Sequence, residues 1–581
     1  MKRVFILSVL LSLCSGLWAQ ETEGIEINEK NFPDPVFREY ISIVNLNGQD
    51  GILTQDEIKR MTNINLGKST THGAKVRNLK GLEYFIYLES LDCSGHELTE
   101  LDISALKNLR ELTCNNNQLT SLDVSTLTNL RELACNNNQL TSLTGVGNTV
   151  LEKIWCWSNK LKSLDVSGLS TLKDLHCEYN QLTSLNVSNC EFLSTLSFQH
   201  NQISSLDISD NPMLTILNIT NNPLSSTSTS LTLKLPNLSG LSCALCGFGS
   251  LDLSGCEKLT SLRCDPLKEM VLPQSLKRLA CISHAKPFTA LNISGLENLE
   301  EVICEDGIME SIQITDCPNL NTLECNNNNL KSLNLDGSGD NSSMLVVRCN
   351  NNKFEELNID KPNLGVLECE DNLLTSLHIS TQSISELFCS NNYLSDIDMP
   401  VQNRMAFLKC YRNNIKADNM EKIIKALPQQ TLSAQGTPMC SFIPYDARSY
   451  AVEDGFKPEG NEILYEQVKE AYGKGFEVVA YTDEKPILGV QLISDYYYRT
   501  VFVGIDGIRA NAAPVIVSST GNTLTVQGAE DGESVTAYDL DGRQLGRSVC
   551  RNGQATLRLS TRTENVILVK IGDDTIKVRM K

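Results

Sequence analysis

The side chains of this 581-residue chain that could carry chemistry are its 21 cysteines, six histidines and three tryptophans. His176 directly precedes Cys177, and an imidazole beside a thiol can activate it as a nucleophile. No Ser-His-Asp set, G-x-S-x-G turn or phosphate-binding glycine loop stands elsewhere in the sequence. Trp155 and Trp157 stand two residues apart, and clustered aromatic side chains are typical of binding sites for proteins and sugars. These residues favour binding over catalysis, and we expect that the chain is not an enzyme.

The cysteines recur at a regular spacing, and this repeat predicts the strands and turns that position the side chains named above. The pattern Leu109-Arg-Glu-Leu112-Thr-Cys114-Asn-Asn-Asn117-Gln-Leu119 returns in about 16 turns, with a usual step of 21 residues. We call the position of Cys114 the centre of its turn, and 14 of the 16 centres are cysteine. The centres are Cys93, Cys114, Cys135, Cys156, Cys177, Phe198, Ile219, Cys243, Cys264, Cys281, Cys304, Cys325, Cys349, Cys369, Cys389 and Cys410. A period of this length indicates stacked repeats, none of which can bury its apolar residues alone.

The residues around each centre alternate in direction, as a strand requires. The centre then points inward, and the residues three before, one before and one after it point outward. Neighbouring turns would pair these strands into a parallel sheet with strands about 4.8 Å apart. An asparagine follows the centre by three residues in 11 turns, where its amide can bond the backbone of adjacent turns.

We expect most of the cysteines to be buried free thiols. Phe198 and Ile219 take the centre position in two turns, so cysteine exchanges there with apolar residues. Cys190, Cys256 and Cys317 fill a second position, where other turns have leucine. Side chains stacked on parallel strands have poor geometry for disulfides, and no cluster of cysteine and histidine has the ligand spacing of a complete metal site.

The repeat, with Leu119-Thr-Ser-Leu122-Asp-Val-Ser125 after the centre, resembles the internalin J-like branch of bacterial leucine-rich repeat proteins. The resemblance covers residues 79–415. It implies an α/β-type, mainly-β solenoid, whose coil of parallel strands presents a concave binding face. For function it implies a surface adhesin that acts in host attachment or biofilm formation. The alternative is a structural surface or matrix protein without a dedicated ligand.

Two segments precede the repeats. Residues 1–20 have the pattern of a secretory signal peptide, and their apolar run is too short to span a membrane. No other segment is long and apolar enough to do so. Residues 21–78 are expected to form a helical cap that shields the apolar end of the first turn. Its two helices would begin after Asp34 and Thr54, which are good N-cap residues.

The loop between these two helices resembles an EF-hand calcium loop. Its candidate metal ligands are Asn45, Asn47, Asp50 and Glu57. Calcium is therefore the one cofactor that the sequence suggests, and the alternative is a purely structural pair of helices.

Three segments follow the repeats. Residues 416–486 are expected to close the coil, with helices at 418–427 and 461–472. Residues 487–512 would be a β-rich linker. Residues 513–581 alternate in short runs and predict a β-sandwich. With Val535-Thr-Ala-Tyr-Asp-Leu-Asp-Gly-Arg543, this segment resembles the sorting domain of type IX secretion cargo. The resemblance implies a secreted protein at the outer membrane surface of a Gram-negative, Bacteroidetes-like bacterium.

The outward strand positions and those just beyond them define the candidate ligand-binding residues of the concave face. The first group comprises Trp155, Trp157, His176, Glu178, Tyr179 and His200. The second group comprises Glu301, Glu305, Glu324, Glu368, Glu370, Phe388 and Tyr411. Carboxylates on adjacent strands repel one another unless a cation or a basic partner compensates them. The alternatives are indole rings that lie flat over a widened groove, and a solvated acidic face that keeps the sheet soluble.

The formal net charge of −20 argues against nucleic acid as a partner, because phosphates require a basic face. The expected partner is a protein or glycan of a host or bacterial surface. We expect the chain to act as a monomer.

Overall fold

The protein is described by a computed structural model with two compact units, Met1–Ser275 and Leu276–Lys581. The structure describes residues 24–44, 50–67, 74–147, 150–224, 230–267, 269–281, 289–335, 345–358, 361–431, 440–446, 460–481, 516–520, 523–527, 531–538, 544–559, 566–571 and 574–579. The expected signal peptide and the expected linker at 487–512 lie outside these residues.

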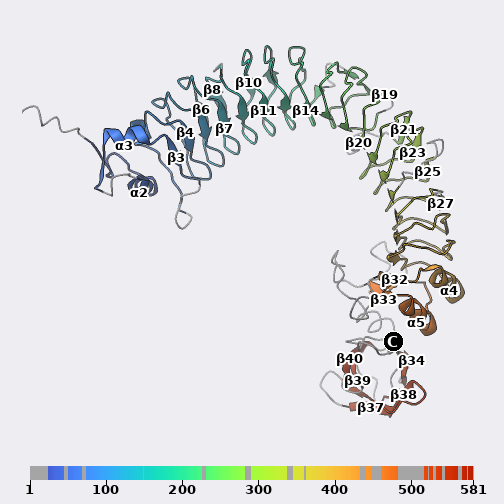
Figure 1. The fold of residues 1–581 in the computed structure, drawn as a ribbon. Helices are drawn as coiled ribbons and strands as arrows, with labels where there is room; N and C mark the ends of the chain where they lie inside the picture. Colours follow the sequence, from blue (N-terminus) through green and yellow to red (C-terminus); the bar gives the residue numbers. More distant parts are fainter. Residues whose placement is uncertain are drawn as a thin grey trace, which may run out of the picture. The chain divides into compact units, whose positions relative to one another are not determined.

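Short parallel strands run through unit 1, one for each coil, and form one long sheet (Figure 1). They are β3 (Asn63–Asn65), β4 (Ser90–Asp92), β5 (Glu111–Thr113), β7 (Glu132–Ala134), β9 (Lys153–Trp155), β11 (Asp174–His176), β13 (Thr195–Ser197), β14 (Ile216–Asn218), β16 (Gly240–Ser242) and β18 (Ser261–Cys264). Leu133, Ile154 and Leu175 are partners in adjacent strands, so the register repeats from coil to coil. We call the solvent side of this sheet the sheet face.

The inward direction of the centres follows from the alternation of apolar and polar residues. Ile154 and Cys156 are fully buried, whereas Trp155 between them is half-buried on the sheet face. The expected strand precedes or reaches each centre within the described residues, so the register inferred from the repeat is confirmed.

The asparagine ladder joins neighbouring coils. Nδ2 of Asn159 donates to the carbonyl oxygens of Cys135 and Cys156, each at 3.1 Å, and its Oδ1 accepts from the Leu140 amide at 2.9 Å. The same three bonds recur at Asn138 and at Asn180, which confirms the expected role of this position. Each amide thereby satisfies backbone groups that the tight turn leaves unpaired.

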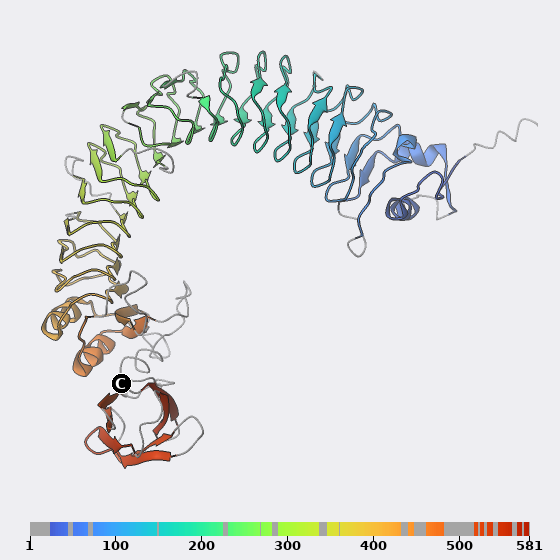
Figure 2. The same cartoon turned by 180° about the vertical axis from the view of Figure 1, so that it is seen from behind.

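A second set of short strands, the outer strands, lies on the return path of the coils (Figures 1 and 2). In unit 1 they are β6 (Ser121–Asp123), β8 (Ser142–Thr144), β10 (Ser163–Asp165), β12 (Ser184–Asn186), β15 (Ser230–Thr232), β17 (Ser250–Asp252) and β19 (Glu269–Val271). Asp123 accepts a hydrogen bond from the Ser125 amide at 2.9 Å, and Asp165 accepts one from the Ser167 amide at 3.0 Å. An aspartate that accepts from the amide two residues later forms a side-chain turn, which ends the outer strand.

The front of unit 1 contains two short helices and a two-stranded antiparallel sheet of β1 (Ile25–Glu26) and β2 (Ile52–Leu53). Helix α2 (Pro35–Val44) begins after Asp34, whose Oδ1 accepts from the Val36 and Phe37 amides. Helix α3 (Gln55–Arg60) begins after Thr54 with the expected capping box. A 3-10 turn, η2 (Leu82–Tyr84), leads into the first coil.

Unit 2 continues the same architecture. Its long sheet comprises β20 (Arg278–Cys281), β22 (Glu301–Ile303), β24 (Thr322–Glu324), β26 (Val346–Arg348), β28 (Val366–Glu368), β30 (Glu386–Phe388), β31 (Phe407–Lys409), β32 (Cys440–Asp446) and β33 (Phe476–Tyr481). Its outer strands are β21 (Ala290–Ser294), β23 (Ser311–Thr315), β25 (Ser332–Asn334), β27 (Glu356–Asn358) and β29 (Ser376–His378). The segment after the repeats thus adds two strands to the sheet, which the sequence did not predict.

Two helices accompany β32 and β33. Helix α4 (Ala417–Ala426) matches the expected helix within a residue at each end. Helix α5 (Tyr465–Gly473) begins four residues later than expected. The reason is Asn461, which extends the asparagine ladder: it donates to the Cys410 carbonyl at 2.7 Å and accepts from the Ile415 amide at 2.9 Å.

The carboxyl-terminal part of unit 2 consists of two antiparallel sheets, as the alternating pattern predicts. One contains β34 (Ile516–Thr520), β35 (Thr523–Gln527) and β38 (Gln554–Arg558), and the other contains β36 (Ser534–Tyr538), β37 (Gln544–Val549), β39 (Val566–Ile571) and β40 (Asp574–Arg579). The sequence did not predict β37.

The 20 cysteines within the described residues are all free and buried, as expected. In the same residues, no helix combines the length and the apolar character that a bilayer span would need.

Candidate functional site

Three adjacent strands of unit 1 bring most of the first group of candidate residues together. In the sheet, His176 of β11 is the partner of Trp155 in β9 and of Ser197 in β13. Trp155 and His176 stand one residue before their centres, and Trp157 and Glu178 stand one residue after theirs. All four therefore reach the sheet face from neighbouring coils, because side chains on a strand alternate in direction.

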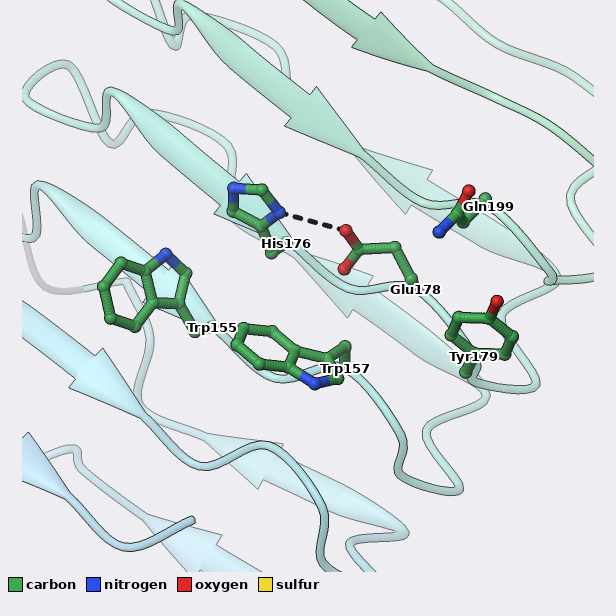
Figure 3. A pocket seen from close by; sticks show the side chains of 6 residues that line it. All are labelled: Trp155, Trp157, His176, Glu178, Tyr179 and Gln199. Carbon is green, nitrogen blue, oxygen red and sulfur yellow. Dashed lines mark hydrogen bonds and ion pairs between the residues drawn. The ribbon is translucent and has the colours of Figure 1, made fainter. Parts of the chain in front are cut away.

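A hollow of about 460 Å³ lies between these side chains. Its lining residues are Trp155, Trp157, His176, Glu178, Tyr179 and Gln199 (Figure 3). Five of the six were candidates from the sequence. Gln199 was not, although it follows its centre by one residue, as Trp157 and Glu178 do, and the register alone would have found it.

The indole rings make one wall of the hollow. The ring centroids of Trp155 and Trp157 are 6.4 Å apart and their planes are tilted by 51°. Trp157 meets the His176 ring edge to face, with a centroid distance of 6.3 Å. Both rings are half-buried at the hollow (Figure 3), and because their planes are tilted by 51° to each other, they cannot both lie flat over the sheet.

A histidine and a carboxylate make the opposite wall. Nδ1 of His176 lies 3.0 Å from Oε1 of Glu178 (Figure 3), and this contact raises the pKa of the imidazole. Glu178 is only 9% exposed, and its second oxygen, Oε2, makes no hydrogen bond with any described residue. An unpaired oxygen of a buried carboxylate is costly unless a ligand or water satisfies it.

Tyr179 and His200 border the hollow in a left-handed backbone conformation. Both have positive φ angles, 52° and 56°, at a turn position that asparagine holds in several other coils, such as Asn137 and Asn221. Their rings stack on each other with centroids 4.4 Å apart, although His200 does not line the hollow itself. Leu245 and Arg412 have the same conformation at the equivalent position of their turns, so the conformation belongs to the repeat. What distinguishes Tyr179 and His200 is the stacking of their rings.

His176 and Cys177 do not form a catalytic pair, because the strand sends them to opposite faces. The Cys177 thiol is fully buried and donates a weak hydrogen bond to the Ser197 carbonyl at 3.6 Å. Burial raises the pKa of this thiol well above its ordinary value. A protonated thiol behind the sheet is a poor nucleophile.

The acidic candidates of unit 2 are compensated within the chain. Arg348 donates to Glu324 and to Glu368, the second at 2.8 Å. Glu301 pairs with Arg278 at 2.7 Å, and Glu305 accepts from the Asn326 amide group at 2.6 Å. We call these glutamates the acidic strip of unit 2. These partners, two arginines and one asparagine, belong to the chain itself, whereas the sequence predicts a cation or a basic partner from outside.

The last candidates of unit 2 form a self-contained cluster. Lys409 pairs with Glu370 at 2.9 Å and lies over the rings of Phe388 and Tyr411, at 5.7 and 5.5 Å from their centroids. Tyr411 is only 7% exposed, so little of its ring is open to a ligand in the free protein, and its role in binding stays a prediction. Its neighbours cover it, and the cluster stabilises the sheet.

The candidate calcium ligands are only partly described. Asn45 and Asn47 lie outside the described residues. Oε2 of Glu57 accepts from both the amide and the hydroxyl of Thr54 at 2.7 Å, and Asp50 accepts from the Ile52 amide at 3.0 Å. No group of three or more potential metal ligands occurs among the described residues. Calcium binding stays a prediction of the sequence.

Comparison with known proteins places this geometry in context. The family model "Leucine Rich repeats (2 copies)" matches residues 107–148. Comparison with curated protein sequences gives no match. Among solved structures, the chain is similar to the functional domain of InlJ from Listeria monocytogenes, whose description includes a cysteine ladder. The identity is 19% and the TM-score 0.49, over 96% of this chain and 99% of that chain.

Two further solved structures are similar over large parts of the chain. YopM from Yersinia enterocolitica is 21% identical, with a TM-score of 0.41, over 65% of this chain and 91% of that chain. The internalin InlF from Listeria monocytogenes is 17% identical, with a TM-score of 0.30, over 80% of this chain and 100% of that chain.

The parallel coils, the asparagine ladder and the matched repeat define the class of this protein. The chain has a mainly-β solenoid fold with a leucine-rich repeat match at residues 107–148, and this architecture is typical of protein-binding scaffolds. Internalins are among its structural neighbours.

Proposed function

We propose that this chain is an adhesin that binds a surface protein or glycan through the hollow on the sheet face of unit 1. The observation that carries the proposal is the aromatic wall: two of the three tryptophans of the chain stand side by side at this hollow. Exposed aromatic clusters are typical centres of binding energy in interfaces.

The surrounding sheet face supports this proposal because it is rigid. Glu152 pairs with Arg131 at 2.8 Å and with Lys173 at 2.7 Å across three coils. The ladder of Asn159 and its equivalents fixes the turns behind these strands. A preformed site loses little conformational entropy when a partner binds. More of the free energy of the contacts therefore remains as binding affinity.

The proposed place of action is the surface of a Gram-negative bacterium, in host attachment or biofilm formation. This part of the proposal rests on the signal-peptide pattern of residues 1–20 and on the resemblance of residues 513–581 to secretion sorting domains. Cell fractionation of a producing strain, with antibody against the repeats, would locate the protein.

The test of binding is a double variant, Trp155→Leu with Trp157→Leu, in the chain from residue 21. Leucine keeps apolar volume but removes the aromatic faces. We expect binding of the labelled protein to cultured host cells and to biofilm to fall at least tenfold, with unchanged circular dichroism. Phe192→Ala is the matched control, because Phe192 is an aromatic residue that is 58% exposed and does not line the hollow. Equal binding by the double variant would favour a purely structural role.

A further inference from the structure

The hollow contains an unsatisfied negative group. The side chain of Glu178 is 12% exposed, its Oε1 contacts His176, and its Oε2 has no hydrogen-bond partner among the described residues. In Figure 3 the carboxylate stands among the lining side chains, on the same side of the sheet as both indole rings. A buried carboxylate oxygen of this kind attracts a charged hydrogen-bond donor.

Two other acids of neighbouring coils, Glu132 and Glu152, already have cationic partners. Glu132 pairs with Lys153 at 2.7 Å, and Glu152 holds both Arg131 and Lys173. Glu178 differs from them, because its one described ionic partner is a histidine, which is charged only when protonated. A cation that enters the hollow would give this carboxylate a second ionic partner. Because Oε2 has almost no accessible surface in the free protein, the Glu178 side chain turns toward the hollow when that cation binds.

The aromatic wall favours the same kind of group. The ammonium of Lys153 lies 6.0 Å from the centroid of the Trp155 ring, so that ring already attracts a cation from its own chain. Cations are held over indole faces by the ring quadrupole. A planar cation can stack on a ring and donate hydrogen bonds at its edge, which a compact ammonium does less well.

We infer that the hollow receives the guanidinium group of an arginine side chain on a partner protein, which stacks on the indole rings and donates to Oε2 of Glu178. The net charge of −20 would draw a basic partner surface toward the chain. This inference rests on the proposed function, since it names the chemical group that the adhesin recognises at the same hollow.

The experiment uses the chain from residue 21 and two synthetic peptides, acetyl-Gly-Arg-Gly-amide and the same peptide with citrulline in place of arginine. Citrulline has nearly the same shape as arginine but no charge. Affinity is measured by nuclear magnetic resonance titration of the indole N–H signals. The variant Glu178→Gln removes the charge and keeps the shape. Glu111→Gln is the matched control, because Glu111 lies in β5 on the same face and does not line the hollow.

We expect the arginine peptide to bind at least tenfold more tightly than the citrulline peptide. We also expect Glu178→Gln to weaken arginine binding at least tenfold, while Glu111→Gln changes it less than twofold. Equal affinity for the two peptides, no binding of either, or an unchanged affinity in Glu178→Gln would overturn the inference. If the double tryptophan variant loses cell binding while Glu178→Gln keeps it, the adhesin proposal stands and the arginine inference fails.

Discussion

At the scale of single residues, the site depends on side chains that break the pattern of their repeat. Most turns have asparagine, aspartate or glycine two residues after the centre, where the backbone is left-handed. Tyr179 and His200 stand there instead and stack on each other at the border of the hollow. The sequence alone identifies these two exceptions, because the repeat shows which residue types usually occupy each position of the turn. It could not identify the unpaired oxygen of Glu178, which depends on how the His176 ring turns.

The variant Tyr179→Asn tests whether the tyrosine at this turn serves function. Asparagine adopts the left-handed conformation more easily than tyrosine, so the backbone strain, which is about 1 kcal/mol, should be relieved. We expect the urea midpoint to stay equal or rise, and cell binding to fall severalfold because the hollow loses a wall. A variant that binds as the wild type does would show that Tyr179 is only tolerated at this turn.

The His176–Glu178 contact predicts a dependence on pH. The hydrogen bond and the charge of Glu178, with a smaller contribution from Asp174, raise the pKa of His176, while burial lowers it. The charged neighbour on the adjacent strand is Lys153 of β9. A raised folded-state pKa means that the pair stabilises the fold fully below the unfolded imidazole value, about 6.5, and that this contribution is lost as the pH rises through the folded-state value.

The measurement is a titration of the His176 ring signals by nuclear magnetic resonance. In Glu178→Gln we expect the pKa of His176 to fall, since a neutral amide no longer favours the imidazolium. An unchanged pKa in that variant would mean that Glu178 is not the cause of the shift.

At the scale of elements, each coil depends on a buried centre and a satisfied turn. The sequence predicted both, because cysteine exchanges with Phe198 and Ile219, and because an inward asparagine needs backbone partners. It could not predict that Arg348 bridges Glu324 and Glu368, since that pairing depends on long side chains from three coils. Nor did it assign Asn461 to the ladder, because 51 residues separate it from Cys410.

The cysteine ladder predicts that the fold is sensitive to alkali. Burial raises the pKa of Cys135 to about 12 and that of Cys246 to about 12, and the pKa of Cys156 also lies well above its ordinary value. Above about pH 8.5 the unfolded chain loses thiol protons that the folded chain retains. The free energy of unfolding should then fall by about 1.4 kcal/mol per pH unit for each such thiol.

Urea unfolding at pH 8 and at pH 10 measures this effect. Cys156→Val removes one thiol while keeping an apolar centre. The free energy of unfolding should then fall less steeply with pH, by about 1.4 kcal/mol per pH unit. Native protein should also resist alkylation by iodoacetamide until it unfolds. Thiols that react readily in the folded protein would contradict the buried register on which the site rests.

At the scale of the whole molecule, the repeat predicted the solenoid class but not every segment that completes it. The continuation of the sheet into β32 and β33 was missed, because Cys440 and Phe476 lack the spacing of the repeat. The sequence predicted an open binding site in both groups of candidate residues. The structure favours such a site only in the first group, in unit 1. The acidic strip of unit 2 is paired with side chains of the chain itself, whereas the hollow of unit 1 has an unpaired carboxylate oxygen. Compensation of that kind depends on packing, which a periodic pattern does not specify.

The central claim is that the two indole rings of the hollow meet solvent in the free protein and a partner in the complex. Acrylamide quenching of tryptophan fluorescence tests it directly, in a chain that begins at residue 21 so that Trp18 does not contribute. We predict that Trp155 and Trp157 are quenched readily in the free protein and are protected when a partner recovered from host or bacterial surfaces is bound. Rings that resist the quencher in the free protein, or that stay equally accessible in the complex, would contradict the account.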